Sequence, residues 1–178
     1  PMLERHRLEL GNGIKVRLNG TADVWDVSGK FSFKVNNIDP LFTLGDLAGQ
    51  RDEVIRKLRE LGLYDANKHV EVPLVPLRLA LITSLGSAAH RDAEKELTES
   101  GIGFSIFTYD ARVQGDGAVP SLVKAIDHCS RRDDIDLVMV VRGGGSRTDL
   151  LAYDSLEVAS AIGRCAKPVF VGVGHEVD

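Results

Sequence analysis

The chain has 178 residues, of which 43% are hydrophobic, and its formal charge at pH 7 is −4. This length fits one ordinary domain or two small ones with a real core, and the lack of a long apolar run or of a signal-type segment argues against a membrane or secreted protein. The net negative charge argues against a protein whose whole surface binds nucleic acid, although a local basic groove is compatible with it.

Residues 1–41 have the pattern of β-strands. Apolar and polar side chains alternate over 14–18 and again over 31–35. Turns are expected at three glycine-containing segments, 11–13, 19–20 and 28–29. Two or three strands cannot form a stable closed sheet alone, so this segment must pack on the rest of the chain, pair with another chain or be the remnant of a barrel.

Three aromatic residues of this segment suggest a contact with DNA. Trp25, Phe31 and Phe33 could stack nucleobases on a strand surface. Aromatic residues at strand spacing more often belong to a core, so both interpretations stay open.

Residues 42–76 predict a linker helix and an extended connector. Apolar residues recur at helical spacing from Leu44 to Leu61, with charged residues on the other face, and Gly62 is a suitable stop. The segment 72–76, VPLVP, cannot continue a helix, because proline lacks an N–H and restricts the residue before it. We therefore expect a domain boundary at this connector.

Residues 77–178 alternate regularly between two kinds of pattern. Short apolar strands are expected at 77–83, 104–109, 136–141 and 168–173. Helices are expected between them, at 87–100, 120–130 and 149–165. Strands separated by helices of this length indicate right-handed βαβ crossovers, so the predicted fold is α/β with a parallel sheet, preceded by the small β segment and the linker helix.

The most informative segment of the chain is 138–146, VMVVRGGGS. An apolar strand ends there in Arg142, three glycines and Ser146, and a helical pattern follows. Glycines at 143, 144 and 145 allow positive φ angles, so that backbone N–H groups face outward beside the arginine and a helix N-terminus. We expect Arg142, Gly143, Gly144, Gly145 and Ser146 to bind a phosphate or another anion; the alternative is a tight strand-to-helix turn.

The carboxyl ends of parallel strands gather at one edge of the sheet, where ligands bind. His175 at this edge is suited to proton transfer near neutral pH, and Asp178 could orient its imidazole or help to hold a divalent ion. Asp92 follows the first strand and could orient a water molecule or bind a metal ion. The alternatives are that His175 caps a helix and that Asp92 lies on a solvated helix face. The segment from His175 resembles the start of an HExxH zinc site, but Asp178 stands at its fourth position and the sequence shows no second histidine for it, which argues against a zinc protease.

Four motifs together resemble the family of the bacterial exodeoxyribonuclease VII large subunit: TSLGSAAHRD (83–92), VQGDGA (113–118), VRGGGSRTDL (141–150) and GHEVD (174–178). Upstream, GKFSFKVNNIDP (29–40) resembles the last strand of the family's OB-fold, and residues 58–84 resemble its approach to the catalytic domain. The resemblance thus implies a partial OB-fold at 1–41 and a nuclease catalytic domain at 77–178.

This resemblance implies an exonuclease that hydrolyses single-stranded DNA to oligonucleotides, in DNA catabolism and repair. The residues linked to activity in the family match Asp92, Arg142, His175 and Asp178. As a hypothesis, Arg142 and the glycine N–H groups hold the scissile phosphate, His175 is the general acid or base, and Asp178 orients it. Asp92, Glu176 and Asp178 could hold Mg²⁺, although His175 and Arg142 could also act without a metal ion.

The partners that the resemblance implies are single-stranded DNA and the family's small subunit. The Pro1-Met2 start and the GHEVD end suggest a piece of a longer protein, in which the first OB-fold strands and the small-subunit-binding region lie outside this chain. One alternative is therefore a non-catalytic DNA-binding or assembly fragment, and another is an α/β enzyme acting on a nucleotide or sugar phosphate. Two widely spaced cysteines, Cys129 and Cys165, fit reduced thiols and a cytoplasmic protein.

Overall fold

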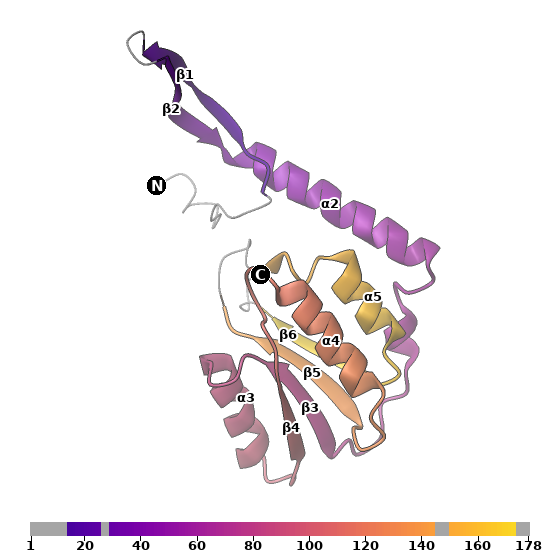
Figure 1. Cartoon of the computed structure of the whole chain (residues 1–178). Helices are drawn as coiled ribbons and strands as arrows, with labels where there is room; N and C mark the ends of the chain where they lie inside the picture. Colours follow the sequence, from indigo (N-terminus) through magenta and orange to yellow (C-terminus); the bar gives the residue numbers. More distant parts are fainter. Residues whose placement is uncertain (1–13, 26–28, 145–149, 174–178) are drawn as a thin grey trace. The chain divides into compact units, whose positions relative to one another are not determined.

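A computed structural model describes residues 14–25, 29–144 and 150–173 of the chain (Figure 1). The chain divides into two compact units, Pro1–Asp52 and Glu53–Asp178. None of the helices in the described ranges has the length and apolar character needed to cross a membrane.

The first unit contains an antiparallel ribbon of two strands, β1 (Arg17–Trp25) and β2 (Lys30–Asp39). The sequence predicts a turn at Asn19 and Gly20, and this prediction is wrong, because β1 runs straight through both residues and only the pairing register shifts there. A Cβ at Gly20 would clash with the carbonyl oxygen of Lys34 and lie 2.8 Å from a ring carbon of Phe33, so the glycine allows β2 to approach closely at this register shift.

Helix α2 (Pro40–Glu60) follows the ribbon directly. It begins four residues before the apolar pattern that starts at Leu44, because the chain has a good helix start at Asp39. The Asp39 carboxylate accepts hydrogen bonds from the backbone N–H groups of Leu41 and Phe42, at 3.1 and 3.2 Å, and Pro40 occupies the first helical position, where its missing N–H costs nothing.

The second unit is built on a parallel sheet with the strand order β4-β3-β5-β6. The strands are β3 (Arg78–Thr83), β4 (Ser105–Asp110), β5 (Leu137–Arg142) and β6 (Val169–Val173). The prediction of an α/β fold with a parallel sheet is confirmed. The chain moves from β3 outward to β4 and then crosses back to β5 on the other side of β3, so the strand order reverses between β3 and β5.

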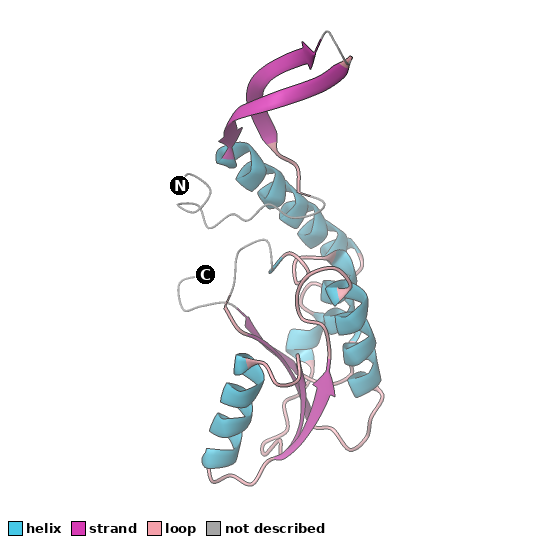
Figure 2. Ribbon diagram, turned by 60° about the vertical axis from the view of Figure 1, so that its left-hand side comes forward, coloured by secondary structure: helices cyan, strands magenta, loops and turns pink. Residues whose placement is uncertain are grey.

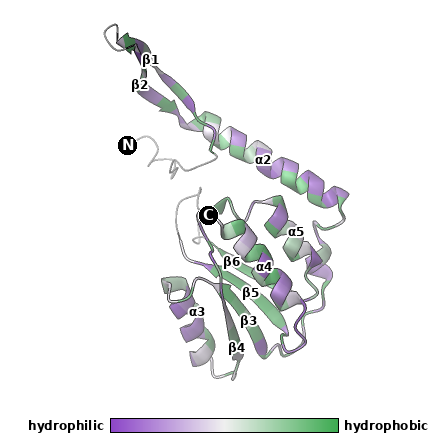
Figure 3. Cartoon of the chain, viewed as in Figure 1, coloured by the Kyte–Doolittle hydropathy of each residue, from purple (hydrophilic) through white to green (hydrophobic). Residues whose placement is uncertain are grey.

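Helices cover both faces of this sheet (Figure 2). Helix α3 (Ala88–Glu99) lies on one face, whereas α4 (Ala118–Ser130) and α5 (Leu156–Arg164) pack side by side on the other. Figure 3 shows the apolar strands between the more polar outer faces of the helices. The core consists mainly of buried side chains from β3, β5, α4 and α5, among them Ile82, Leu122, Ile126, Val140 and Val158.

The division into units falls inside α2, between Asp52 and Glu53, whereas the sequence places a domain boundary at 72–76. The segment after α2 packs on the second unit through a short 3₁₀ helix, η1 (Ala66–His69). The Asn67 amide donates to the carbonyl oxygens of Cys165 and Lys167 and accepts from the N–H of Val169. These bonds fasten residues 66–69 to the start of β6.

Candidate functional site

A cleft of about 340 Å³ lies at the carboxyl ends of β3 and β5. This position is the point where the strand order reverses, which is where open parallel sheets bind their ligands. The lining residues come from the β3–α3 turn, the β4–α4 loop and the end of β5: Ser84, Ser87, Ala88, Ala89, Arg112, Val113, Gln114, Arg142, Gly143 and Gly144.

Arg142 is the last residue of β5 and pairs with Val173 of β6. Its side chain is buried, with 4% of the residue exposed, and its Nη2 donates a hydrogen bond to Gln114 Oε1 at 3.0 Å. The amide oxygen is neutral, so it orients the guanidinium group without cancelling its charge. A guanidinium group held in this way is suited to bind phosphate oxygens through several N–H donors.

The β4–α4 loop that carries Gln114 is anchored at two residues just before Gln114, namely Ala111 and Val113. The N–H of Ala111 donates to the carbonyl oxygen of Thr83 at 2.9 Å, and the Tyr153 hydroxyl donates to the carbonyl oxygen of Val113 at 3.1 Å. Burial raises the pKa of Tyr153 to about 12, against a smaller opposite effect of the Arg142 charge, so this hydroxyl remains a donor at neutral pH.

The N-terminus of α3 forms another wall of the cleft. Ser87 caps this helix, because its hydroxyl accepts a hydrogen bond from the N–H of His90 at 3.1 Å. The first N–H groups of a helix lack intrahelical acceptors, and those of Ala88 and Ala89 belong to this first turn. Both residues line the cleft, so the positive end of the α3 dipole acts on the same space as Arg142.

The structure brings three residues of the predicted anion site together in this cleft, namely Arg142, Gly143 and Gly144. The expectation of positive φ angles is wrong for Gly143, which does not adopt one. A Cβ on Gly143 would lie 3.5 Å from the Cβ of Ala89, which is an ordinary contact distance, so the end of β5 passes close to α3 at this point. The helix expected from 149 begins at Leu156, so the helix N-terminus that lines the cleft with Arg142 is that of α3.

Five further predicted residues lie outside the described residues: Gly145, Ser146, His175, Glu176 and Asp178. Asp92 is described, and it is exposed on α3 and does not line the cleft. It follows Ala88 and Ala89 by one helical turn, so it shares their face of α3. Within the described ranges, no three His, Cys, Asp or Glu side chains come together as a metal site. The predicted ligand set for Mg²⁺ therefore stays a prediction.

The three aromatic residues predicted to contact DNA are exposed on the ribbon of the first unit. Phe31 pairs with Val24 and Phe33 with Ala22, so both rings lie on one face, whereas Trp25 pairs with Lys30 and belongs to the other face. The two phenylalanines and Trp25 therefore do not form one stacking surface.

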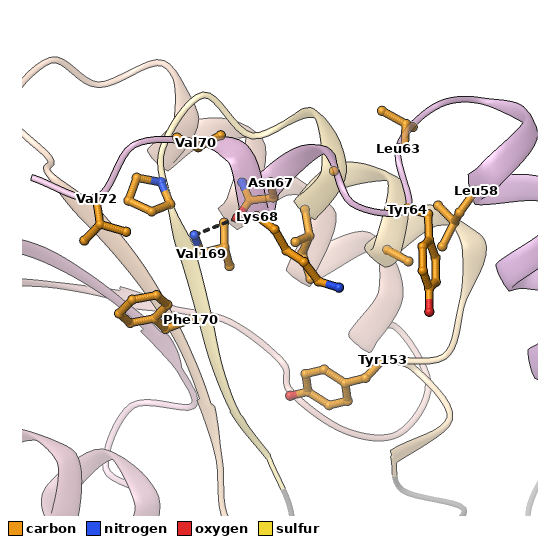
Figure 4. A pocket seen from close by; sticks show the side chains of 14 residues that line it. Leu58, Leu63, Tyr64, Asn67, Lys68, Val70, Val72, Tyr153, Val169 and Phe170 are labelled. Atoms are coloured by element: carbon orange, nitrogen blue, oxygen red, sulfur yellow. Dashed lines mark hydrogen bonds between the residues drawn. The ribbon is translucent and has the colours of Figure 1, made fainter.

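A larger cavity of about 470 Å³ lies elsewhere in the second unit, between η1, α5 and β6 (Figure 4). Its lining is mostly apolar, and two of its polar side chains have partners: Asn67 bonds the backbone near β6, and Lys68 pairs with Asp65. This cavity contains no arginine and no α-helix N-terminus among its described lining residues, so the smaller cleft is the better candidate for phosphate chemistry.

Sequence reasoning missed the roles of Arg112, Gln114 and the α3 N-terminus. A signal for the first two was available, because the loop 111–117 follows the second strand of the parallel sheet and must reach the same edge as the loop after Arg142. Nothing in the local sequence indicates that Gln114 bonds Arg142, since 28 residues separate them.

Comparison with known proteins places this site in a family context. A family model described as "Exonuclease VII, large subunit" matches residues 63–178. The exodeoxyribonuclease 7 large subunit of Clostridium novyi (strain NT) is 36% identical over 167 residues, which are 94% of this chain and 42% of that protein. The proteins of the same name from Streptococcus pneumoniae (strain ATCC BAA-255 / R6) and Alkaliphilus oremlandii (strain OhILAs) are 34% and 36% identical, over 96% and 93% of this chain. The chain covers 38% and 40% of these two proteins, so it spans about two fifths of the length of such relatives.

Proposed function

This chain belongs to the exonuclease VII large-subunit family, and we propose that its cleft binds the scissile phosphate in an enzyme that hydrolyses single-stranded DNA to oligonucleotides. The observation that carries this proposal is the buried Arg142, oriented by Gln114 at the strand-order reversal of the sheet. Nucleases need such a group, because negative charge builds up on the phosphoryl oxygens during cleavage.

The residues of the cleft suggest how the phosphate is bound. Arg142 offers its N–H donors from the end of β5, and the first-turn N–H groups of α3, those of Ala88 and Ala89, offer further donors to the same cleft. Gly143 and Gly144 leave the backbone open to the ligand, since neither has a side chain. Donors fixed by the fold need no reorganisation when charge develops, which favours the transition state.

The proton-transfer residues in this proposal come from the family resemblance. His175 acts as general acid or base and Asp178 orients its imidazole, while Asp92 positions a water molecule or a cation. Asp92 has a suitable location for this role, one turn beyond the two alanines that line the cleft. Mg²⁺, if the protein uses it, would assist by stabilising charge on the phosphate oxygens.

The partners of the whole protein belong to the same proposal. The relatives are named large subunits, and we expect the whole protein to assemble with a small subunit and to act in the cytoplasm. Exposed Phe31 and Phe33 on one face of the ribbon are candidates for stacking on bases of the DNA strand.

Incubation of the purified chain with end-labelled single-stranded DNA, first with Mg²⁺ and then with a chelator, tests this function. We expect oligonucleotide products, and we expect Arg142→Ala to abolish them. Arg131→Ala is the control and should leave them unchanged, because Arg131 follows the end of α4 that is remote from the cleft. Retention of DNA without cleavage would indicate a DNA-binding or assembly fragment instead. The absence of both cleavage and retention would overturn the proposal. Full activity of Arg142→Ala would overturn it as well.

A further inference from the structure

Arg112 is the second arginine of the cleft, and the binding of one phosphate by Arg142 leaves it without a role. Arg112 is exposed. Its side chain lies beside Gly117, because a Cβ built on Gly117 would be 3.5 Å from Arg112 Nη1. Its backbone is fixed, because its N–H donates to the Ser121 hydroxyl at 2.9 Å and both its neighbours, Ala111 and Val113, are buried.

Most other guanidinium groups of the second unit are held by a carboxylate, a carbonyl oxygen or an aromatic ring, as in Arg56, Arg59, Arg78, Arg91 and Arg132. Within the ranges that the structure describes, Arg112, Arg131 and Arg164 have no such partner. Of these three, Arg112 alone lines the cleft.

The lining of the cleft therefore includes two guanidinium groups, those of Arg112 and Arg142. Arg112 and Gln114 lie two residues apart in one anchored loop, and Gln114 holds Arg142, so both guanidinium groups act on the same cleft. The described lining residues include no carboxylate, and Arg112 has no ion pair within the described part of the chain. Two cations in one cleft suit a ligand that carries more than one anionic group.

We propose that Arg112 binds the phosphate next to the one held by Arg142, so that the cleft contacts two successive phosphates of a single DNA strand. This inference rests on the proposed function, because it takes the ligand of the cleft to be DNA. Contacts to the backbone fix the position of a strand without reading its bases. Arg112 therefore places the scissile bond relative to Arg142, whichever bases flank it.

The dependence of DNA binding on salt tests this role directly. Each phosphate contact on a single strand contributes about −0.7 to the slope of log Kobs against log salt concentration. We expect Arg112→Gln to make this negative slope shallower by about 0.7 and to weaken binding roughly tenfold, as for a lost hydrogen bond to a charged group. Arg112→Lys keeps the positive charge and should keep the slope. Binding of a fluorescent oligothymidylate to the purified chain, measured by anisotropy in a chelating buffer over a range of KCl concentrations, gives both quantities.

Arg131→Gln is the matched control, because Arg131 is exposed, lacks an ion pair among the described residues and follows the far end of α4. It should leave slope and affinity unchanged. An unchanged slope in Arg112→Gln, with normal binding by the unsubstituted chain, would overturn the inference while leaving the proposed function intact. Failure of the unsubstituted chain to bind, or normal binding by Arg142→Gln, would instead overturn the proposed function together with this inference.

Discussion

Arg142 has two properties that a phosphate-binding residue needs. Its burial places the guanidinium group where the surroundings weaken electrostatic interactions less than bulk water does, and Gln114 holds one end of that group without bringing a negative charge. A carboxylate at position 114 would fix the arginine as well, but it would cancel much of its attraction for phosphate.

Replacing Gln114 by methionine removes the acceptor while keeping a side chain of similar length. We expect kcat for single-stranded DNA cleavage to fall about tenfold to hundredfold, because a lost hydrogen bond to a charged group costs roughly 1.5–3 kcal/mol. KM should change less, since the phosphate can still reach a misoriented arginine. Steady-state kinetics measure both constants, and Gln50→Met, on the exposed face of α2, is the control. Equal effects of the two substitutions would contradict a positioning role for Gln114.

Tyr153 makes the stability of the folded chain depend on pH in the alkaline range. Its hydroxyl has a pKa of about 12 in the folded chain, above the ordinary value of 10.0, so it contributes stability below pH 10 that is lost as the pH rises toward 12. We expect Tyr153→Phe to lower the free energy of unfolding by about 1 kcal/mol at pH 7, because the Val113 carbonyl oxygen loses its donor.

This difference between Tyr153→Phe and the unsubstituted chain should shrink between pH 10 and about 12. Urea unfolding followed by circular dichroism at several pH values measures it. Tyr64→Phe, which removes an exposed hydroxyl, should keep the pH dependence of the unsubstituted chain. A constant difference for Tyr153→Phe over this range would show that the Tyr153 hydroxyl does not control alkaline stability.

At the scale of elements, two serines cap helices of the second unit, but only one of them lines the cleft. Ser87 accepts from the N–H of His90 at the start of α3, and Ser155 accepts from the N–H of Val158 at the start of α5. Replacing either by alanine should cost about 1 kcal/mol of stability. Only Ser87→Ala should also weaken oligothymidylate binding, because it loosens the α3 N-terminus at the ligand.

Thermal unfolding and anisotropy titrations of both variants separate the two effects. Equal weakening of DNA binding by Ser155→Ala would show that general stability, and not the α3 N-terminus, determines binding.

The elements of the second unit could be predicted because their sequence signals are local. The apolar runs around Leu81 and Val140 are buried strands, and Ser87 precedes the helical pattern of α3 at its cap position. The start of α5 was predicted too early, because apolar residues before Ser155 share the helical spacing while the cap itself fixes the beginning at Leu156. The bond between Gln114 and Arg142 could not be predicted, since it depends on how two loops meet in space.

At the scale of the whole molecule, the chain consists of two units that differ in character. The ribbon of the first unit exposes residues on both of its faces, whereas the second unit buries a continuous core around its sheet. The family resemblance from four motifs is confirmed by the match over 63–178, and all four motifs lie within that range.

Cys129 and Cys165 are both buried and free, and burial raises the pKa of the Cys129 thiol to about 11, so we expect it to react slowly with alkylating agents.

We expect single-stranded DNA to bind by its phosphates at the carboxyl edge of the parallel sheet. Titration of the isotope-labelled chain with oligothymidylate, followed by NMR, tests it most directly. We predict that the backbone amide signals of Ala88, Ala89 and Gly143 shift on binding, while those of Gly101 and Arg131, at the opposite edge, do not. Shifts confined to the opposite edge, or saturable DNA binding without any shift at the first three amides, would show that the strand binds elsewhere.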